Sequence, residues 1–120
     1  MEDNDMPVTA VLSHWRLTVK CIEACFDLQW AFEWHNTLHH RDELHEMWPL
    51  LSEQEQMRVQ PVLSRWDERF TAATAPMRNP DAAVPEDGRW WHDRCPLRVT
   101  GKPGQELPPL WSPPTYLDEE

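Results

Sequence analysis

Histidine and carboxylate side chains recur at helical spacing in the middle of the chain. His35, His39, Asp42 and Glu46 follow one another at intervals of four, three and four residues. A helix brings such positions onto one face, where imidazole and carboxylate groups together can bind a divalent metal such as zinc. One helix supplies only part of a metal site, and the sequence offers further ligands at His14, His92 or Cys95.

A solvated polar face of a helix has the same pattern, and no second cluster of ligands accompanies this one. The zinc-binding pattern His-Glu-x-x-His and the paired Glu-x-x-His pattern of di-iron bundles are both absent from the sequence. We therefore expect no metal and no cofactor, and we expect folding to need no metal. If a metal does bind, His35, His39 and Asp42 are the candidate ligands.

A thiol and a base form the second candidate for chemistry. His92 and Cys95 are three residues apart, and a neighbouring histidine can activate a cysteine nucleophile. Such proximity is common in a proline-rich segment, so we expect Cys95 to be inert. Cys21 and Cys25 are four residues apart on a predicted helix, where they favour packing over a disulfide. Because a phosphate-binding glycine loop is also absent, we predict that the protein is not an enzyme.

Carboxylates dominate the charge of the chain. The 21 acidic and 11 basic residues give a formal net charge of −10. This charge disfavours binding to nucleic acid or to an anionic membrane, and it favours association with basic protein surfaces. A solvated acidic face is the alternative interpretation. The residues that we expect to face a basic partner are Glu33, Asp42, Glu43 and Glu46.

Tryptophan is the other unusual component, with eight residues in a chain of 120. Each indole can bury roughly 150–250 Å² of surface, so tryptophans either fill the core or anchor a partner at an interface. Trp90 and Trp91 are adjacent and lie between Arg89 and Arg94. We predict that these two tryptophans contribute to the partner-binding surface.

Proline and glycine divide the chain that must position these groups. Neither residue occurs between Pro7 and Pro49, whereas all three glycines and ten of the twelve prolines lie at or after Pro61. This distribution predicts a helical core over residues 1–74 and an extended, proline-rich segment over residues 75–120 that packs on it. The two parts would form one domain.

Apolar spacing predicts helices over residues 8–47 and 53–73. The stripe of the first helix shifts by about one residue near Asp27, which indicates either a break with Asp27 as N-cap or one long helix with a drifting face; we favour the break. Ser52 and Glu55 form a capping box at the next helix. The residues expected to be buried are Val11, Trp15, Val19, Ile22, Trp34, Leu38, Leu63, Trp66 and Phe70.

Two features within these segments leave alternatives open. Pro61 implies either a kink or the start of another helix. In the second half, Leu97 to Leu107 could form a short hairpin around Gly101 and Gly104. The predicted fold class is mostly α: a two- or three-helix antiparallel hairpin or bundle, with the proline-rich segment packed across it.

The acidic N-terminus, the odd number of cysteines and the lack of a long apolar run indicate a cytoplasmic, soluble protein. We predict a non-catalytic protein that inhibits or regulates a protein partner by binding to a basic or nucleic-acid-binding surface of that partner. In general character only, such chains resemble phage-encoded inhibitors of host defence, including anti-CRISPR proteins and DNA mimics. The alternatives are an accessory subunit of an enzyme complex and a His/carboxylate metal-binding protein, and a homodimer is compatible with all three.

Overall fold

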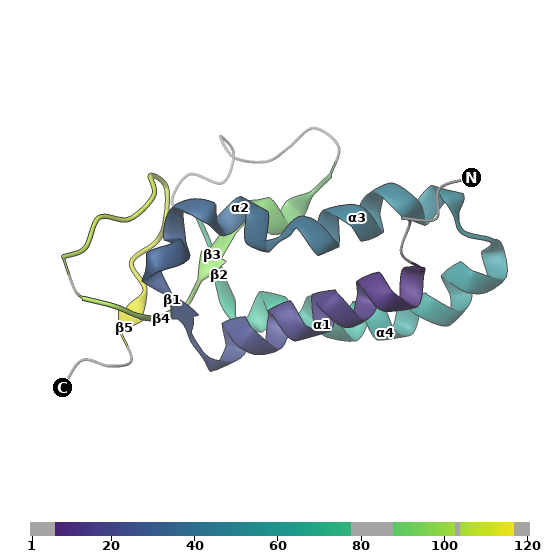
Figure 1. The fold of residues 1–120 in the computed structure, drawn as a ribbon, viewed down its shortest axis with the longest axis horizontal. Helices are drawn as coiled ribbons and strands as arrows, with labels where there is room; N and C mark the ends of the chain where they lie inside the picture. Colours follow the sequence, from purple (N-terminus) through teal and green to yellow (C-terminus); the bar gives the residue numbers. More distant parts are fainter. Residues whose placement is uncertain (1–6, 78–87, 103, 117–120) are drawn as a thin grey trace.

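The protein is mostly α-helical, as the sequence predicts. The computed structural model describes residues 7–77, 88–102 and 104–116. Helices α1 and α4 run in the same direction, and α3, which lies between them in the sequence, runs in the opposite direction (Figure 1). The helical elements are α1 (Val8–Ala24), η1 (Leu28–Glu33), α2 (Trp34–Thr37), α3 (His39–Met47), η2 (Trp48–Leu50), α4 (Glu53–Ala72) and η3 (Trp90–Asp93), where η denotes a 3₁₀ helix.

The first predicted helix is broken where the apolar stripe shifts. Helix α1 ends at Ala24, and a two-residue strand, β1 (Phe26–Asp27), separates it from η1. The Asp27 carboxylate accepts a hydrogen bond from the backbone N–H of Gln29, so it caps η1 as expected. This confirms the predicted break. Trp30 on η1 is half-exposed, because the tighter 3₁₀ helix turns it outward.

Helix α4 starts at the predicted capping box. The Ser52 hydroxyl accepts from the Glu55 N–H, and the Glu55 carboxylate accepts from the Ser52 N–H. The helix continues through Pro61, which excludes a separate helix starting there. All nine residues expected to be buried are buried.

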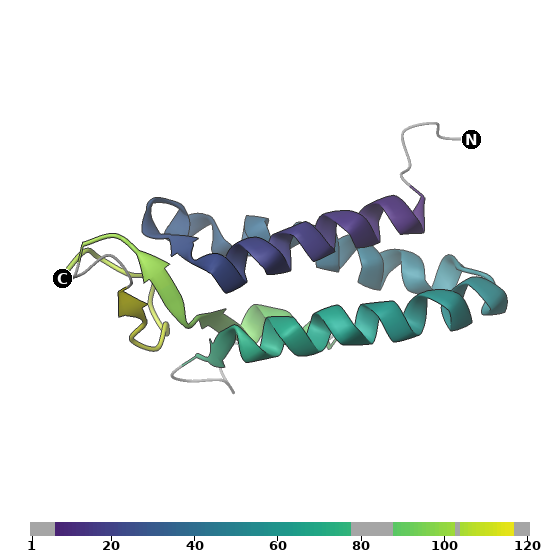
Figure 2. The same cartoon turned by 90° about the horizontal axis from the view of Figure 1, so that it is seen from below.

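Short strands join distant parts of the chain (Figure 2). Strand β4 (Arg98–Thr100) lies between β1 and β5 (Thr115–Tyr116) and is parallel to both. The hairpin that the sequence allowed around Gly101 does not form in the described part of the chain, because β4 pairs in parallel with β1 and with β5 rather than in an antiparallel hairpin. A second pair joins β2 (Thr74–Pro76) and β3 (Arg94–Pro96) in antiparallel register.

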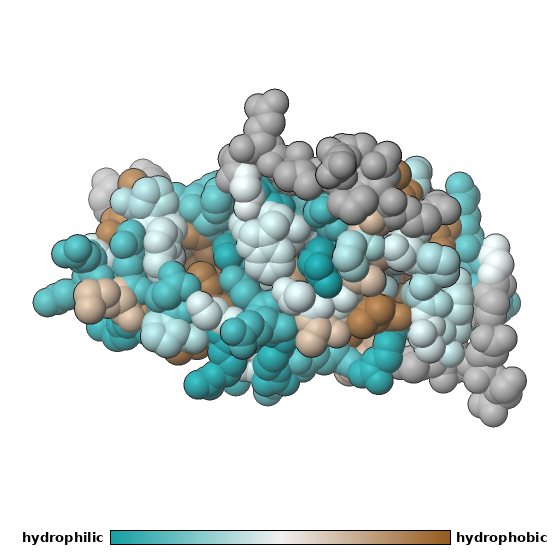
Figure 3. Space-filling view, turned by 180° about the vertical axis from the view of Figure 1, so that it is seen from behind, coloured by the Kyte–Doolittle hydropathy of each residue, from teal (hydrophilic) through white to brown (hydrophobic). Residues whose placement is uncertain are grey.

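Aromatic rings make up much of the core. Trp34 packs edge-on against Phe26 and Trp111, and it stacks with Phe70 at a centroid distance of 6.4 Å. Trp91, Cys95, Val99 and Trp111 extend the same core from the second half of the chain. On the face opposite to that of Figure 1, hydrophilic residues cover most of the described surface and hydrophobic patches are small (Figure 3). No helix among the described residues has the length and apolarity that crossing a membrane requires.

Candidate functional site

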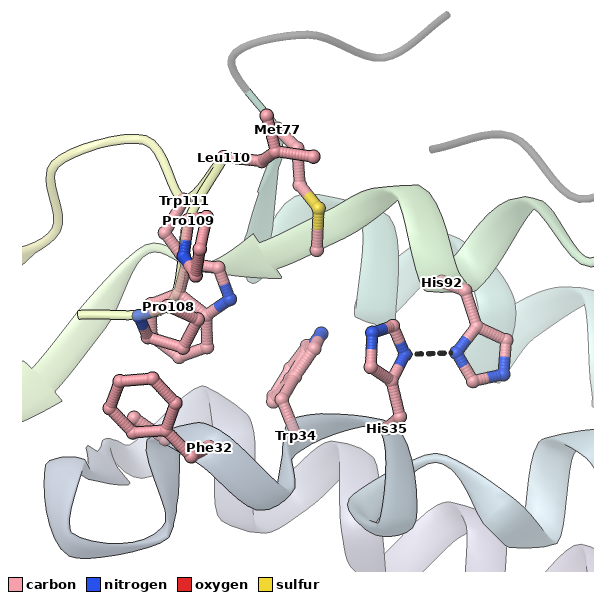
Figure 4. A pocket seen from close by; sticks show the side chains of 10 residues that line it. Phe32, Trp34, His35, Met77, His92, Pro108, Pro109, Leu110 and Trp111 are labelled. Atoms are coloured by element: carbon pink, nitrogen blue, oxygen red, sulfur yellow. Dashed lines mark hydrogen bonds between the residues drawn. The ribbon is translucent and has the colours of Figure 1, made fainter. Parts of the chain in front are cut away.

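An aromatic pocket of about 390 Å³ opens where the helices meet the C-terminal segment. Phe32 and Trp34 line one side, and the chain from Pro108 to Trp111 lies across from them (Figure 4). His35 and His92 stand at the other end of the pocket. A volume of this size suits a small ligand or one large side chain of a partner.

The break in the first helix is what positions the pocket. Because η1 ends at Glu33 and α2 starts at Trp34, Phe32 and His35 lie on either side of the buried Trp34 (Figure 4). The Trp34 indole donates a hydrogen bond of 2.7 Å to the Arg94 carbonyl, which fixes the ring in the wall of the pocket. Opposite, Leu110 has a φ of 77°, a conformation that is uncommon for a bulky residue and is found most often at binding sites and turns.

Two histidines and a carboxylate form a chain of hydrogen bonds beside the pocket. The Nδ1 atoms of His35 and His92 are 2.7 Å apart, and His92 Nε2 is 2.8 Å from Asp42 Oδ1. If the N–H at His92 Nε2 donates a hydrogen bond to the Asp42 carboxylate, the Nδ1 of the His92 ring accepts a hydrogen bond from His35. His35 Nε2 then carries a lone pair, and it lies on the side of the ring toward Trp34 and Met77 (Figure 4).

This chain of groups gives the pocket one adjustable polar wall. Burial lowers the pKa of His35 below its ordinary value, the nearby His92 lowers it further, and Asp42 opposes the shift. His35 is therefore a neutral imidazole at physiological pH, and it can accept a hydrogen bond from a bound group. The remaining lining is apolar, apart from His92 and the backbone.

A buried network connects this site to the three long helices. The Trp91 indole donates to Asp42 Oδ1 at 2.7 Å, and the Arg41 guanidinium lies 4.2 Å from the centre of the same ring. Arg41 forms two hydrogen bonds of 2.9 Å with Asp67 on α4, and Asp67 also accepts from the indole of Trp15 on α1. Each of these polar groups has a hydrogen-bond partner, so burying the network leaves none of them unsatisfied.

The structure corrects the expected role of Trp91. Its side chain is 1% exposed because the ring packs between Arg41 and Trp90 and its N–H is bound by Asp42. Trp91 is a core residue and has no surface to offer a partner. Trp90 is 37% exposed, and its ring contacts Phe70 and Trp91 edge-on, so it is only partly available.

The four predicted acidic contacts have different surroundings. Asp42 is used internally, and Arg89 lies 3.6 Å from its carboxylate and 3.0 Å from that of Glu46. Glu43 lies 4.0 Å from His40, and Glu33 is exposed at the end of η1. Arg89 thus offsets part of the negative charge of α3, which spacing within the helix could not reveal.

The candidate metal ligands of the sequence are not brought to one point. His35 and Asp42 both face His92, whereas the Nδ1 of His39 bonds to the Asn36 carbonyl. The prediction assumed a continuous helix from His35 to Glu46, but a turn at Leu38 separates α2 from α3 and changes the phase of the face. Among the described residues, the grouping that could hold a metal is His39, His40 and Glu43.

The surroundings of Cys95 agree with the expectation that it is not a nucleophile. It is fully buried, its Sγ lies 3.6 Å from the Ala75 carbonyl, and burial raises the pKa of the thiol. The ring of His92 bonds to His35 and Asp42. A protonated, enclosed thiol is a poor nucleophile.

Two exposed aromatic residues escaped the sequence prediction. Trp30 and Phe32 on η1 are 50% and 62% exposed. Phe32 lines the aromatic pocket, and Trp30 lines a second pocket of about 460 Å³ together with Leu17 and Cys21. The signal in the sequence was the proximity of two large aromatics to the stripe shift at Asp27.

The chain matches no family model, no curated protein and no solved structure.

Proposed function

We propose that the protein is a non-catalytic binding protein that regulates a protein partner with a basic surface, and that η1 is its contact element. The observation that carries the proposal is the exposure of Trp30 and Phe32 on this short helix, each at the edge of a pocket. Asp27 and Glu33 are exposed at the two ends of the same segment. An aromatic contact flanked by carboxylates suits an apolar side chain with basic neighbours.

The aromatic residues would supply most of the affinity. Tryptophan is enriched among interface residues whose truncation costs about 2 kcal/mol or more. Exposed indole and phenyl rings are costly to leave in water, and burying them against a partner recovers that free energy. The aromatic pocket adds a recess into which one apolar side chain of the partner can enter, with His35 available to a polar atom at its end.

The carboxylates would act mainly on the rate of association. A net charge of −10 attracts a basic surface over a distance of about one Debye length, roughly 8 Å at physiological salt. Glu33 and Glu43 are the acidic side chains of the predicted set that are exposed and are not paired with Arg89. An accessory subunit buried in a larger complex would not need such steering.

The test is capture of partners from the native host by the immobilised protein, followed by binding kinetics with each purified candidate. Trp30→Ala and Phe32→Ala should each raise the dissociation rate, by about 2 kcal/mol in binding free energy at a central position. Glu33→Lys should lower the association rate at low salt, and the loss should shrink at high salt because ions screen the steering.

Leu50→Ala and Met57→Ala are the matched controls, because Leu50 and Met57 are also highly exposed apolar residues but lie on η2 and α4. Both should bind like the unaltered protein. If Trp30→Ala and Phe32→Ala leave binding unchanged, η1 is not the contact element. Recovery of one protein at fixed stoichiometry and without salt dependence would favour the accessory-subunit alternative.

A further inference from the structure

Imidazole rings gather where α3 begins. The rings of His39 and His40 are 3.9 Å apart between centroids, and His40 Nε2 lies 4.0 Å from Glu43 Oε1. One ligand atom from each of His39, His40 and Glu43 lies within 4.8 Å of the others. From α1, His14 stacks on His40 with a centroid distance of 4.6 Å and an angle of 10° between the planes. Two histidines and one carboxylate thus come together on α3, and His14 of α1 lies beside them.

The hydrogen bond of His39 prepares its ring for a metal. Its Nδ1 lies 2.8 Å from the Asn36 carbonyl oxygen, which can only accept a proton. The proton of the neutral ring is therefore on Nδ1, and Nε2 carries the lone pair. Metal-bound histidines usually donate their second ring N–H to a carbonyl or carboxylate in this way, which fixes the tautomer and the ring orientation.

We propose that His39, His40 and Glu43 form a binding site for a divalent transition metal ion, with His14 as the fourth ligand. The donor set is three imidazoles and one carboxylate, which suits Zn²⁺ and also Cu²⁺ or Ni²⁺. Hard cations such as Ca²⁺ and Mg²⁺ bind oxygen ligands, and this cluster offers a single carboxylate for them. The site is separate from the aromatic pocket and does not depend on the proposed function.

The geometry is close to that of a bound site but more open. Bonds of about 2.0–2.2 Å to a tetrahedral ion place neighbouring ligand atoms roughly 3.3 Å apart. The side chains of His39 and Glu43 are exposed, so small rotations about their side-chain bonds bring their ligand atoms together. The lone pairs of an imidazole lie in the plane of its ring, so the exposed His14 has to turn out of its parallel stack on His40 before both rings can bind one ion. His39 and Glu43 are four residues apart on α3, and His40 and Glu43 are three apart, so the helix holds all three on adjoining positions.

His14 makes the site more than a feature of one helix. It lies on α1, whereas the other three ligands lie on α3, and these two helices pack against each other. An ion held by both helices would tie them together near Leu38, where the chain turns from α2 into α3. The metal would also fill the polar end of the pocket that contains Trp30, since His14, His39 and His40 all line it.

The experiment is a titration of the full chain, first treated with a chelator, with Zn²⁺ alone in a calorimeter and with Co²⁺ alone in a visible-absorption cell. The unaltered protein should bind one equivalent, and Co²⁺ should give the intense visible bands of a four-coordinate site. His39→Ala and His40→Ala should each weaken binding at least tenfold, and Glu43→Gln and His14→Ala should weaken it about tenfold. Circular dichroism of each variant verifies that the helices remain.

His35→Ala and Glu46→Gln are the matched controls, because both residues belong to the helical stripe but lie outside the cluster. Their affinities should equal that of the unaltered protein. Loss of binding in His35→Ala, or full affinity in the His39→Ala/His40→Ala double variant, would overturn the site. Full affinity in His14→Ala would overturn the assignment of the fourth ligand. If His40→Ala disturbs the fold, His39→Ala still decides, since the side chain of His39 is exposed.

Discussion

Asp42 shows how a residue predicted for the surface is used inside the molecule. Its carboxylate accepts from the Trp91 indole and binds the His92 ring, so its charge stabilises a pair of groups distant in sequence. The spacing of Asp42 from His35 and His39 was visible, but its partners lie on η3, and no local pattern indicates which surface will meet that segment. For the same reason the exposure of Trp30 and the burial of Trp91 could not be ranked from the sequence.

His35 provides a prediction on pH at this scale. Its pKa is lower in the folded protein than the ordinary value of 6.5, so the unfolded chain binds more protons on this residue. Stability from this group is therefore complete above the ordinary pKa and falls as the pH drops through 6.5 toward the folded-state pKa. Urea denaturation in chelator on both sides of that pH should show a larger loss for the unaltered protein than for His35→Gln.

The comparison between these two proteins removes the contribution of titrating groups that lie away from His35, whereas His92 and Asp42 face the substituted position. A slope with pH that is the same in both would contradict the prediction, because it would mean that His35 binds protons equally in the folded and unfolded states. Glutamine has no ring and loses the stacking contact that His35 makes with His92, with centroids 4.8 Å apart, so the slopes with pH are compared rather than the absolute stabilities.

At the scale of elements, helices were more predictable than the segments that join them. The buried stripe of α1, the capping box at Ser52 and the break at Asp27 are local signals, and the structure confirms all three. Strands β1 and β5 are two residues long, too short for any alternation to show. Their parallel pairing with β4 depends on contacts between separate parts of the chain, which a local pattern could not reveal.

The ion pair between α3 and α4 gives a prediction on stability. Arg41 and Asp67 are largely buried and are joined by two hydrogen bonds. Arg41→Ala leaves the Asp67 carboxylate without a positive charge beside it, so it should lower the free energy of unfolding by about 3–5 kcal/mol. Replacing both partners, as in Arg41→Met/Asp67→Leu, should cost less because no charge stays buried. Urea denaturation monitored by circular dichroism measures both free energies of unfolding.

The pair between Arg69 and Glu23 is the matched control, since it has the same two-bond geometry at the surface. The hydrogen bond from Arg69 lowers the pKa of Glu23, but solvent screens the charges. Glu23→Gln should therefore cost far less than Arg41→Ala. Equal losses in the two variants would show that burial does not determine the contribution of Arg41.

At the scale of the whole molecule, one core holds segments from both halves of the chain. Trp15 on α1, Phe70 on α4, Trp91 on η3 and Trp111 near the C-terminal end belong to the same cluster. The elongated shape, 49 × 29 × 26 Å, follows from the length of α1 and α4. Composition indicated an aromatic core and an acidic surface, but the division of tryptophans between them required the three-dimensional arrangement.

Because aromatic packing supplies the core, removal of metal should leave the fold intact. The proposed metal site lies at exposed and half-buried positions on α1 and α3, and the buried cluster contains none of its ligands. Treatment with a chelator at neutral pH should leave the far-ultraviolet circular dichroism unchanged. The free energy of unfolding should fall only by the contribution of metal binding, with a corresponding drop in the melting temperature. Loss of helical signal on chelation would show that the ion holds the helices together.

The parallel pairing of β1 with β4 has a consequence for the order of synthesis. A ribosome makes β1 and η1 first, and it makes β4 only after all of α4, so a nascent chain carries the edge of β1 unpaired for much of translation. Contacts between such distant segments form late in folding. Leu28 of η1 packs against Gly101 directly after β4, so we expect η1 to settle only once β4 has docked. If η1 is the contact element proposed above, a partner could bind only after the second half of the protein has been translated.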